Sequence, residues 1–343
     1  DDYTPVFWNM CEHRNRMWGI PTTPATTALH WNKRLFREVG LDPDRPPETI
    51  EELNEMAEKL TLWEVTLPDG SKEQRSGYAR DVPQDQKRLL RIGFLPAEPG
   101  WWAWGWGFFY GGKLLSEDGN TVTATDPANV RALEWVADFT RGLGKENVMR
   151  FRTGFGNFSS PQNPFMAGKV AMIIQGVWMY NFIDKYAPGL EWGVGPFPHP
   201  ADRPDLVAPT PVETDILTIP TDCPNPEEAM EFLKFVYSTE GIEILCMGHR
   251  KFSPRSEESE AFKRDHPHPH IGLFRELASS PGAFAAPMTG IFGEYRRDMG
   301  TTVDVVQNLN KHADAALADL QIALQRSLER EREMMQRRYG EKE

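Results

Sequence analysis

The feature that most constrains this chain is the run Trp101 to Tyr110, WWAWGWGFFY, which Gly111-Gly112 follows directly. Four of the chain's 11 tryptophans stand in its first six residues, a density that ordinary core packing rarely needs. Rings two positions apart alternate as on a strand, and rings four apart, such as Trp102 and Trp106, stack as on a helix. The run is therefore either one strongly buried element or the wall of a cleft.

The chemistry of the indole ring favours the cleft. A Trp face is a rigid apolar platform with a polar N–H at its edge, which suits a ligand that is apolar on its faces and polar round its rim. Sugars have this character, and convergent aromatic side chains concentrate in clefts. The run predicts a carbohydrate-binding wall, with burial of all the rings in a core as the alternative.

Length and charge narrow the class of protein. A chain of 343 residues exceeds what one hydrophobic core usually covers, so we expect two lobes. The net charge is -12, and an acidic surface repels phosphate backbones, which argues against nucleic acid as a partner. Cys11, Cys223 and Cys246 show no CxxC spacing, so neither a zinc site nor an obligatory disulfide is predicted. We expect no cofactor and no metal.

Two stretches resemble a known family. The first runs from Gly19 to Thr61 and carries the segments Gly19-Ile20-Pro21, His30-Trp31-Asn32-Lys33, Leu35-Phe36, Val39-Gly40-Leu41 and Pro46-Pro47-Glu48-Thr49. The second runs from Phe165 to Met172 and on to Gly176-Val177-Trp178, and is similar to the pattern "F..GkaAM...G.W". Both resemble the extracellular solute-binding proteins of ABC importers, in the carbohydrate-binding group that includes maltose-binding protein.

The resemblance implies an α/β, two-lobed periplasmic-binding-protein-like fold with a hinge and an interlobe cleft. It assigns residues 1–26 and 213–262 to the first lobe and residues 27–212 and 263–343, with the C-terminal helix, to the second. Family members open with further strands and helices of the first lobe, so we expect that part of the family pattern to be absent from this chain. The chain would be periplasmic or extracellular, with a lipid anchor in the missing N-terminal part as an alternative.

The same resemblance implies function and site. The chain would act as a monomer that binds an oligosaccharide or glycoside and delivers it to the membrane subunits of an ABC importer. The residues expected to contact ligand are Trp101, Trp104, Trp178, Gly176, Thr22, Thr23, Glu213 and Phe292. Of these, the tryptophans and Phe292 would stack on sugar rings, whereas Trp102 and Trp106 would point into the lobe. No catalytic residue is expected.

Several elements are predicted from local pattern. Gly19-Ile20-Pro21 would end an extended segment, and residues 19–27 and 208–214 would cross side by side between two sheets. A proline-rich loop over 195–212 would precede a strand over 215–220. Asn225 would then cap a helix that turns Ala229, Phe232, Leu233 and Val236 inward, and Val303 to Leu328 would form one amphipathic helix.

Two sharper alternatives remain open. A glycoside hydrolase would also line its cleft with Trp, and Glu98 and Glu117 are the acids nearest the aromatic run, but the chain shows no catalytic motif. His266, His268 and His270 invite a metal interpretation, although alternating prolines hold the segment extended and no Cys or carboxylate completes a ligand set. An exposed loop is the expectation for that segment.

Overall fold

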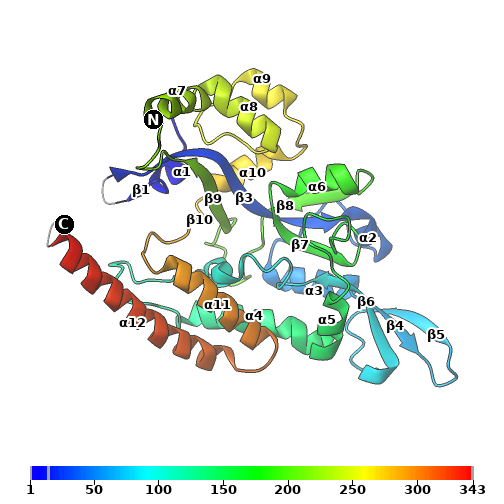
Figure 1. Cartoon of the computed structure of the whole chain (residues 1–343). Helices are drawn as coiled ribbons and strands as arrows, with labels where there is room; N and C mark the ends of the chain where they lie inside the picture. The colour runs from blue at the N-terminus through cyan, green and yellow to red at the C-terminus, as the bar shows by residue number, and fades with distance from the viewer. Residues whose placement is uncertain (1, 14–15, 341–343) are drawn as a thin grey trace.

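A computed structural model describes residues 2–13 and 16–340. The predicted lobe ranges 1–26 and 263–343 therefore extend slightly beyond the described residues, at residues 1, 14–15 and 341–343. Its sheet follows the strand order β10-β9-β3-β7-β6-β4-β5, with β8 also paired to β3 (Figure 1). Its strands are β3 (Ile20–Asn32), β4 (Leu62–Thr66), β5 (Lys72–Ser76), β6 (Lys87–Phe94), β7 (Val170–Gly176), β8 (Trp192–Gly195), β9 (Thr210–Leu217) and β10 (Ala283–Phe284). A separate hairpin pairs β1 (Glu12–His13) with β2 (Arg16–Met17).

The long strand β3 organises the molecule. Its first half pairs antiparallel with β9, and its second half pairs antiparallel with β7 and β8. Strand β7 continues the sheet in parallel with β6. At about 3.3 Å per residue, 13 residues reach about 40 Å, far enough to serve two groups of helices.

The predicted crossing segments do lie side by side, because Ala25 pairs with Glu213 and Thr26 with Val212. Two details of that prediction are wrong. Ile20 and Pro21 begin a strand rather than end one, and the crossing segments belong to one continuous hydrogen-bonded path rather than lying between two sheets. The reason is that a single strand carries both sets of pairings.

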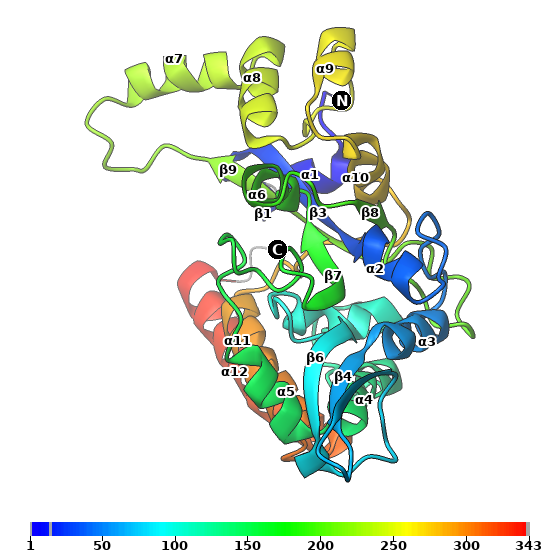
Figure 2. The same ribbon diagram turned by 90° about the vertical axis from the view of Figure 1, so that its right-hand side faces the viewer.

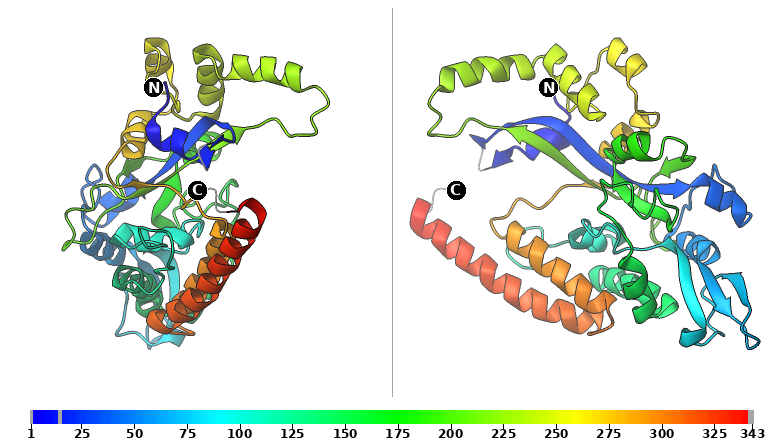
Figure 3. Two further views of the ribbon diagram at one scale, coloured as in Figure 1. Left: turned by 90° about the vertical axis from the view of Figure 1, so that its left-hand side faces the viewer. Right: turned by 45° about the vertical axis from the view of Figure 1, so that its right-hand side comes forward.

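The helices gather into two groups on either side of this strand, which gives the two-lobed shape seen in Figures 2 and 3. One group contains α1 (Pro5–Asn9), α7 (Pro226–Val236), α8 (Thr239–His249), α9 (Glu260–Asp265) and α10 (Ile271–Ala278). The other contains α3 (Ile50–Leu60), the 3-10 helix η2 (Ala103–Tyr110), α4 (Pro127–Leu143), α5 (Lys145–Arg152), α11 (Phe292–Gln307) and α12 (Ala313–Tyr339). The short elements α2 (Lys33–Glu38), α6 (Met179–Tyr186) and the 3-10 turn η1 (Gln84–Gln86) complete the described chain.

Local capping signals explain where two helices begin. Asp126 accepts a hydrogen bond from the amide of Ala128 at 2.8 Å, and Pro127 fills the first position of α4. Thr49 accepts from the amide of Glu52 at 3.2 Å, which is half of a capping box at the start of α3. The Glu52 carboxylate accepts from the amide of Glu48, one residue earlier than the motif expects.

Three expectations from local pattern need correction. The region from residue 303 onward is two packed helices, because Leu309 adopts a left-handed φ of 56° and the amide of Asn310 donates to Val305 O, which ends α11. The strand predicted at 215–220 begins earlier, at Thr210. On α7, Phe232 is 62% exposed and Val236 is buried, because periodicity shows which residues share a face but not whether anything covers that face.

Candidate ligand-binding site

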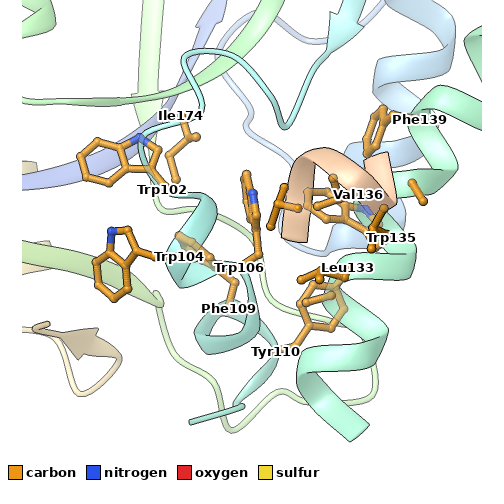
Figure 4. Close-up of a cluster of buried hydrophobic side chains, with 14 of the residues drawn as sticks. Trp102, Trp104, Trp106, Phe109, Tyr110, Leu133, Trp135, Val136, Phe139 and Ile174 are labelled. Atoms are coloured by element: carbon orange, nitrogen blue, oxygen red, sulfur yellow. The ribbon is translucent and has the colours of Figure 1, made fainter. Parts of the chain in front are cut away.

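The aromatic run forms η2, and its rings divide between two environments. Trp106, Phe109 and Tyr110 face α4 and pack into the largest core, as Figure 4 shows. Trp106 is 1% exposed and lies edge-on to Trp135, with ring centroids 5.3 Å apart. Trp106 points into the lobe as expected, whereas Trp102 is buried but lies against Trp101 and Trp178.

Trp104 and Phe292, both predicted to stack on ligand, lie together. Their ring centroids are 5.4 Å apart at 88°, and Trp104 also packs edge-on to Phe284. Trp104 is only 8% exposed, and its backbone carbonyl accepts from the Tyr295 hydroxyl at 2.8 Å. The ring is therefore enclosed by protein, although its role in binding stays a prediction.

Trp101 and Trp178 form a second group. Both are half-buried, and their ring centroids are 6.0 Å apart. Trp102 lies equally close to Trp178, and the indole N–H groups of Trp102 and Trp178 are buried without a hydrogen-bond partner among the described residues. Buried donors in native proteins are nearly always paired, so two unpaired N–H groups beside two accessible rings make this group the candidate ligand site.

Gly176 positions this group. A Cβ at Gly176 would lie 2.4 to 2.5 Å from atoms of the Trp178 ring, so only glycine lets the ring lie against the end of β7. The physical reason is this close approach rather than backbone freedom, because Gly176 does not have a left-handed φ.

Thr22, Thr23 and Glu213 lie where β3 pairs with β9. Both threonines are buried: Thr22 donates to the backbone carbonyl of Asp215 at 3.0 Å, and Thr23 donates to its carboxylate. Lys251 donates to the same carboxylate at 3.0 Å. Burial alone would raise the pKa of Asp215, but the hydrogen bonds from Thr23 and Lys251 outweigh it and lower that pKa. The two hydroxyls are thus engaged inside the protein.

Glu213 differs from its neighbours because its side chain is open to solvent. Desolvation by the surrounding protein nevertheless raises its pKa, against the opposing charges of Lys251 and Arg296. A carboxyl group that is reachable yet partly desolvated is typical of a concave surface. The Lys251 ammonium lies 5.9 Å from the Trp178 ring centroid, which connects this polar group to the accessible tryptophans.

Glu98, an acid that a glycoside hydrolase could use, is also a candidate binding residue. It is 9% exposed, and burial raises its pKa to about 7 against the opposing charge of Arg152. Within the described part of the chain its carboxyl group has no hydrogen-bond or ion-pair partner. It comes three residues before Trp101, directly ahead of the Pro99-Gly100 turn. This position next to the aromatic run is the sequence signal that could have identified Glu98 as a site residue.

A hollow of about 430 Å³ lies elsewhere, between α3, α4 and Tyr78. Its arginines are already neutralised, since Arg80 pairs with Glu58 at 2.9 Å and Arg141 pairs with Asp138 at 2.6 Å. The hollow contains none of the predicted contact residues and offers no orphaned donor. The two accessible tryptophans are the better candidate site.

Comparison with known proteins agrees with this architecture. The family model for bacterial extracellular solute-binding proteins matches residues 1–243, and the chain belongs to this family. A putative binding protein of Brucella abortus (strain 2308) is 25% identical over 223 residues, which are 65% of this chain and 47% of that protein. The chain thus spans about half the length of the curated relatives it matches. A probable amino-acid ABC transporter periplasmic-binding protein of Sinorhizobium fredii is 41% identical over 46 residues, 13% of this chain and 11% of that protein.

Solved structures show the same fold. CpMnBP1 with mannobiose bound superposes with a TM-score of 0.77 at 24% identity, covering 94% of this chain and 75% of that one. Maltose-bound MalE3 of T. maritima gives a TM-score of 0.68 at 17% identity, covering 95% and 77%. At these identities the likeness establishes the two-lobed fold. Among residues 2–13 and 16–340, no helix is both long and apolar enough to cross a membrane.

Proposed function

We propose that this chain binds a carbohydrate, an oligosaccharide or a glycoside, between its lobes and delivers it to an ABC-type membrane importer. The observation that carries the proposal is the pair Trp101 and Trp178, half-buried rings with orphaned indole N–H groups beside them. Ring faces can stack on sugar, and unpaired donors can bind hydroxyl oxygens. Glu98 and Glu213 would add acceptors.

The family and the structural neighbours support this assignment. Two of those neighbours are described as holding mannobiose and maltose. We infer that residues 1–26 and 213–262 belong to the first lobe and residues 27–212 and 279–343 to the second, and that the lobes close over the ligand. The helix α10, which the sequence assigned to the second lobe with residues 263–343, shares a hydrophobic core with α1, which supports its assignment to the first lobe instead. The protein would act outside the cytoplasmic membrane, as a monomer.

The proposal is binding without turnover. A thermal-shift screen against a panel containing mannobiose, maltose and longer oligosaccharides should raise the melting temperature for at least one sugar, by mass action on the folded state. The stabilising sugar should be recovered unchanged after long incubation. Cleavage products that increase with protein amount would favour a glycoside hydrolase instead.

A further inference from the structure

The His-Pro-His-Pro-His segment between α9 and α10 is not the exposed loop expected, because its middle histidine is buried. His268 is 2% exposed, and its ring lies 4.8 Å from that of Tyr180 and 5.3 Å from that of Phe274. His30 on β3 is fully buried, stacks on Trp192 of β8 at 5.4 Å and contacts Phe274 at 5.9 Å. These rings join α10 and the histidine segment to β3, β8 and α6.

Hydrogen bonds fix the position of the ring hydrogen in His30 and the neutral form of His268. His30 Nδ1 lies 3.0 Å from the carbonyl of Ala28; a carbonyl only accepts, so Nδ1 carries the hydrogen. His268 has the opposite form, because its Nδ1 accepts from the amide of His270 at 3.0 Å. The Nε2 atoms of both rings are buried without a close hydrogen-bond partner among the described residues, although the backbone of Val177 acts to raise the pKa of His268.

The backbone of the segment depends on the same chemistry. His266 Nδ1 accepts from the amide of His268 at 3.2 Å, one step before the bond from His270 to His268. Pro267 and Pro269 have no N–H, and the amides of His268 and His270 both donate to imidazole nitrogens that must stay unprotonated. A proton on either Nδ1 would place a donor against a donor.

The surrounding charges make protonation harder still. Burial lowers the pKa of His30 and of His268 to about 3. Burial also lowers the pKa values of His266 and His270, and the nearby cations Arg250 and Lys33 lower them further. The carboxylates on adjoining elements are already paired, namely Asp184 with Arg250, Glu191 with Arg37, Glu258 with Arg275 and Asp265 with Arg264, while Glu276 of α10 is exposed.

We propose that this cluster is an acid-sensitive latch: in mildly acidic solution, protons bind His30, His266 and His268 and release α10 and the 266–270 segment from β3 and β8. The core around η2 contains none of these imidazoles and stays folded. Phe274 of α10 shares a core with Val177, so opening also loosens the turn that carries Trp178. The latch does not depend on which ligand the site binds.

Hydrogen exchange read by mass spectrometry tests the latch directly. Labelling at pH 7.5 and pH 5.0, with times scaled for the intrinsic exchange rate, compares peptides covering 266–278 with peptides of α12. A released imidazole has an ordinary pKa of about 6.5, whereas a latched one has a pKa well below 5. Each such imidazole therefore raises the equilibrium constant for opening roughly thirtyfold at pH 5 relative to pH 7.5. We expect the exchange protection factor of peptides covering 266–278 to fall at least about thirtyfold between pH 7.5 and pH 5.0. The protection factor of the α12 peptides should stay the same. Equal behaviour of the two regions would overturn the proposal.

Matched variants separate the latch from general acid sensitivity. In His266→Asn and His268→Asn, the amide oxygen can accept from the N–H two residues on, as Nδ1 does, but it does not titrate. We expect the double variant to lose at least tenfold of the acid-induced opening, whereas His13→Gln, at an exposed histidine, keeps all of it. A double variant that is folded at pH 7.5 and opens like the parent refutes the latch. If the double variant does not fold, the same hydrogen-exchange comparison is made on His266→Asn alone and on the parent. His266→Asn should then open less in acid than the parent, and equal opening would refute the latch.

Discussion

Gly176 and Trp178 should be energetically coupled, and Gly176→Ala is the perturbation that shows it. The new methyl group would stand 2.4 to 2.5 Å from the Trp178 ring, although alanine is compatible with the backbone there. The ring cannot move freely, because Trp101 and Trp102 lie 6.0 Å from it and Lys251 lies 5.9 Å from it. Overpacking of this kind typically costs about 1–3 kcal/mol.

The clash disappears when the ring is removed. In a Trp178→Ala background, Gly176→Ala should be neutral or should stabilise by about 0.4–1 kcal/mol, through the lower entropy of the unfolded chain. The two substitutions should therefore couple by about 1–4 kcal/mol. If the proposed site is right, each single variant should also lose sugar affinity, by roughly ten- to thirtyfold for the ring itself.

Urea denaturation of the parent, both single variants and the double variant gives the coupling free energy. Far-UV circular dichroism is the better signal, since losing a tryptophan alters fluorescence. Gly300→Ala in α11 is the control, because a Cβ there meets nothing within 4 Å, and its effect should simply add to that of Trp178→Ala. A Gly176→Ala cost that is the same with and without the Trp178 ring would refute the close-approach argument.

Three further outcomes are expected. Trp106→Ala should lose about 3–5 kcal/mol of unfolding free energy and Trp101→Ala much less, as measured by urea titration, because only Trp106 is fully enclosed; equal losses would contradict the division of the rings. Glu98→Gln should stabilise the protein at pH 8 by up to about 3 kcal/mol but have little effect at pH 4.5. The reason is that burial raises the carboxyl pKa from 4.5 to about 7, so the parent loses stability as pH rises through that window. A constant stability difference between parent and variant across pH would count against this. Phe232→Ala on α7 should change the unfolding free energy by no more than about 0.5 kcal/mol, whereas Val236→Ala should cost more; comparable large losses by denaturation would show that the exposed face of α7 is covered in solution.

The site could be predicted only in part. Trp178 was identified from a local pattern, and the structure does place its ring beside that of Trp101. Trp104 was proposed from the aromatic run and the family resemblance, but it is enclosed by Phe284 and Phe292, whose positions some 180 residues away the aromatic run does not encode. Glu98 was overlooked as a binding residue because its raised pKa arises from burial, which no neighbour in sequence reveals.

The sequence by itself determined what short-range forces decide. Asp126 and Pro127 begin α4, Thr49 caps α3, and the apolar run ending at Gly176 is the buried strand β7, because caps and strand patterns act within a few residues. Only the tertiary structure decided the partners across long separations. It bonded Thr22 and Thr23 to Asp215, left α7 with an open apolar face, and buried His268 against Tyr180 and Phe274. Periodicity names the face that an element would bury, whereas the surface that meets it depends on how distant segments pack.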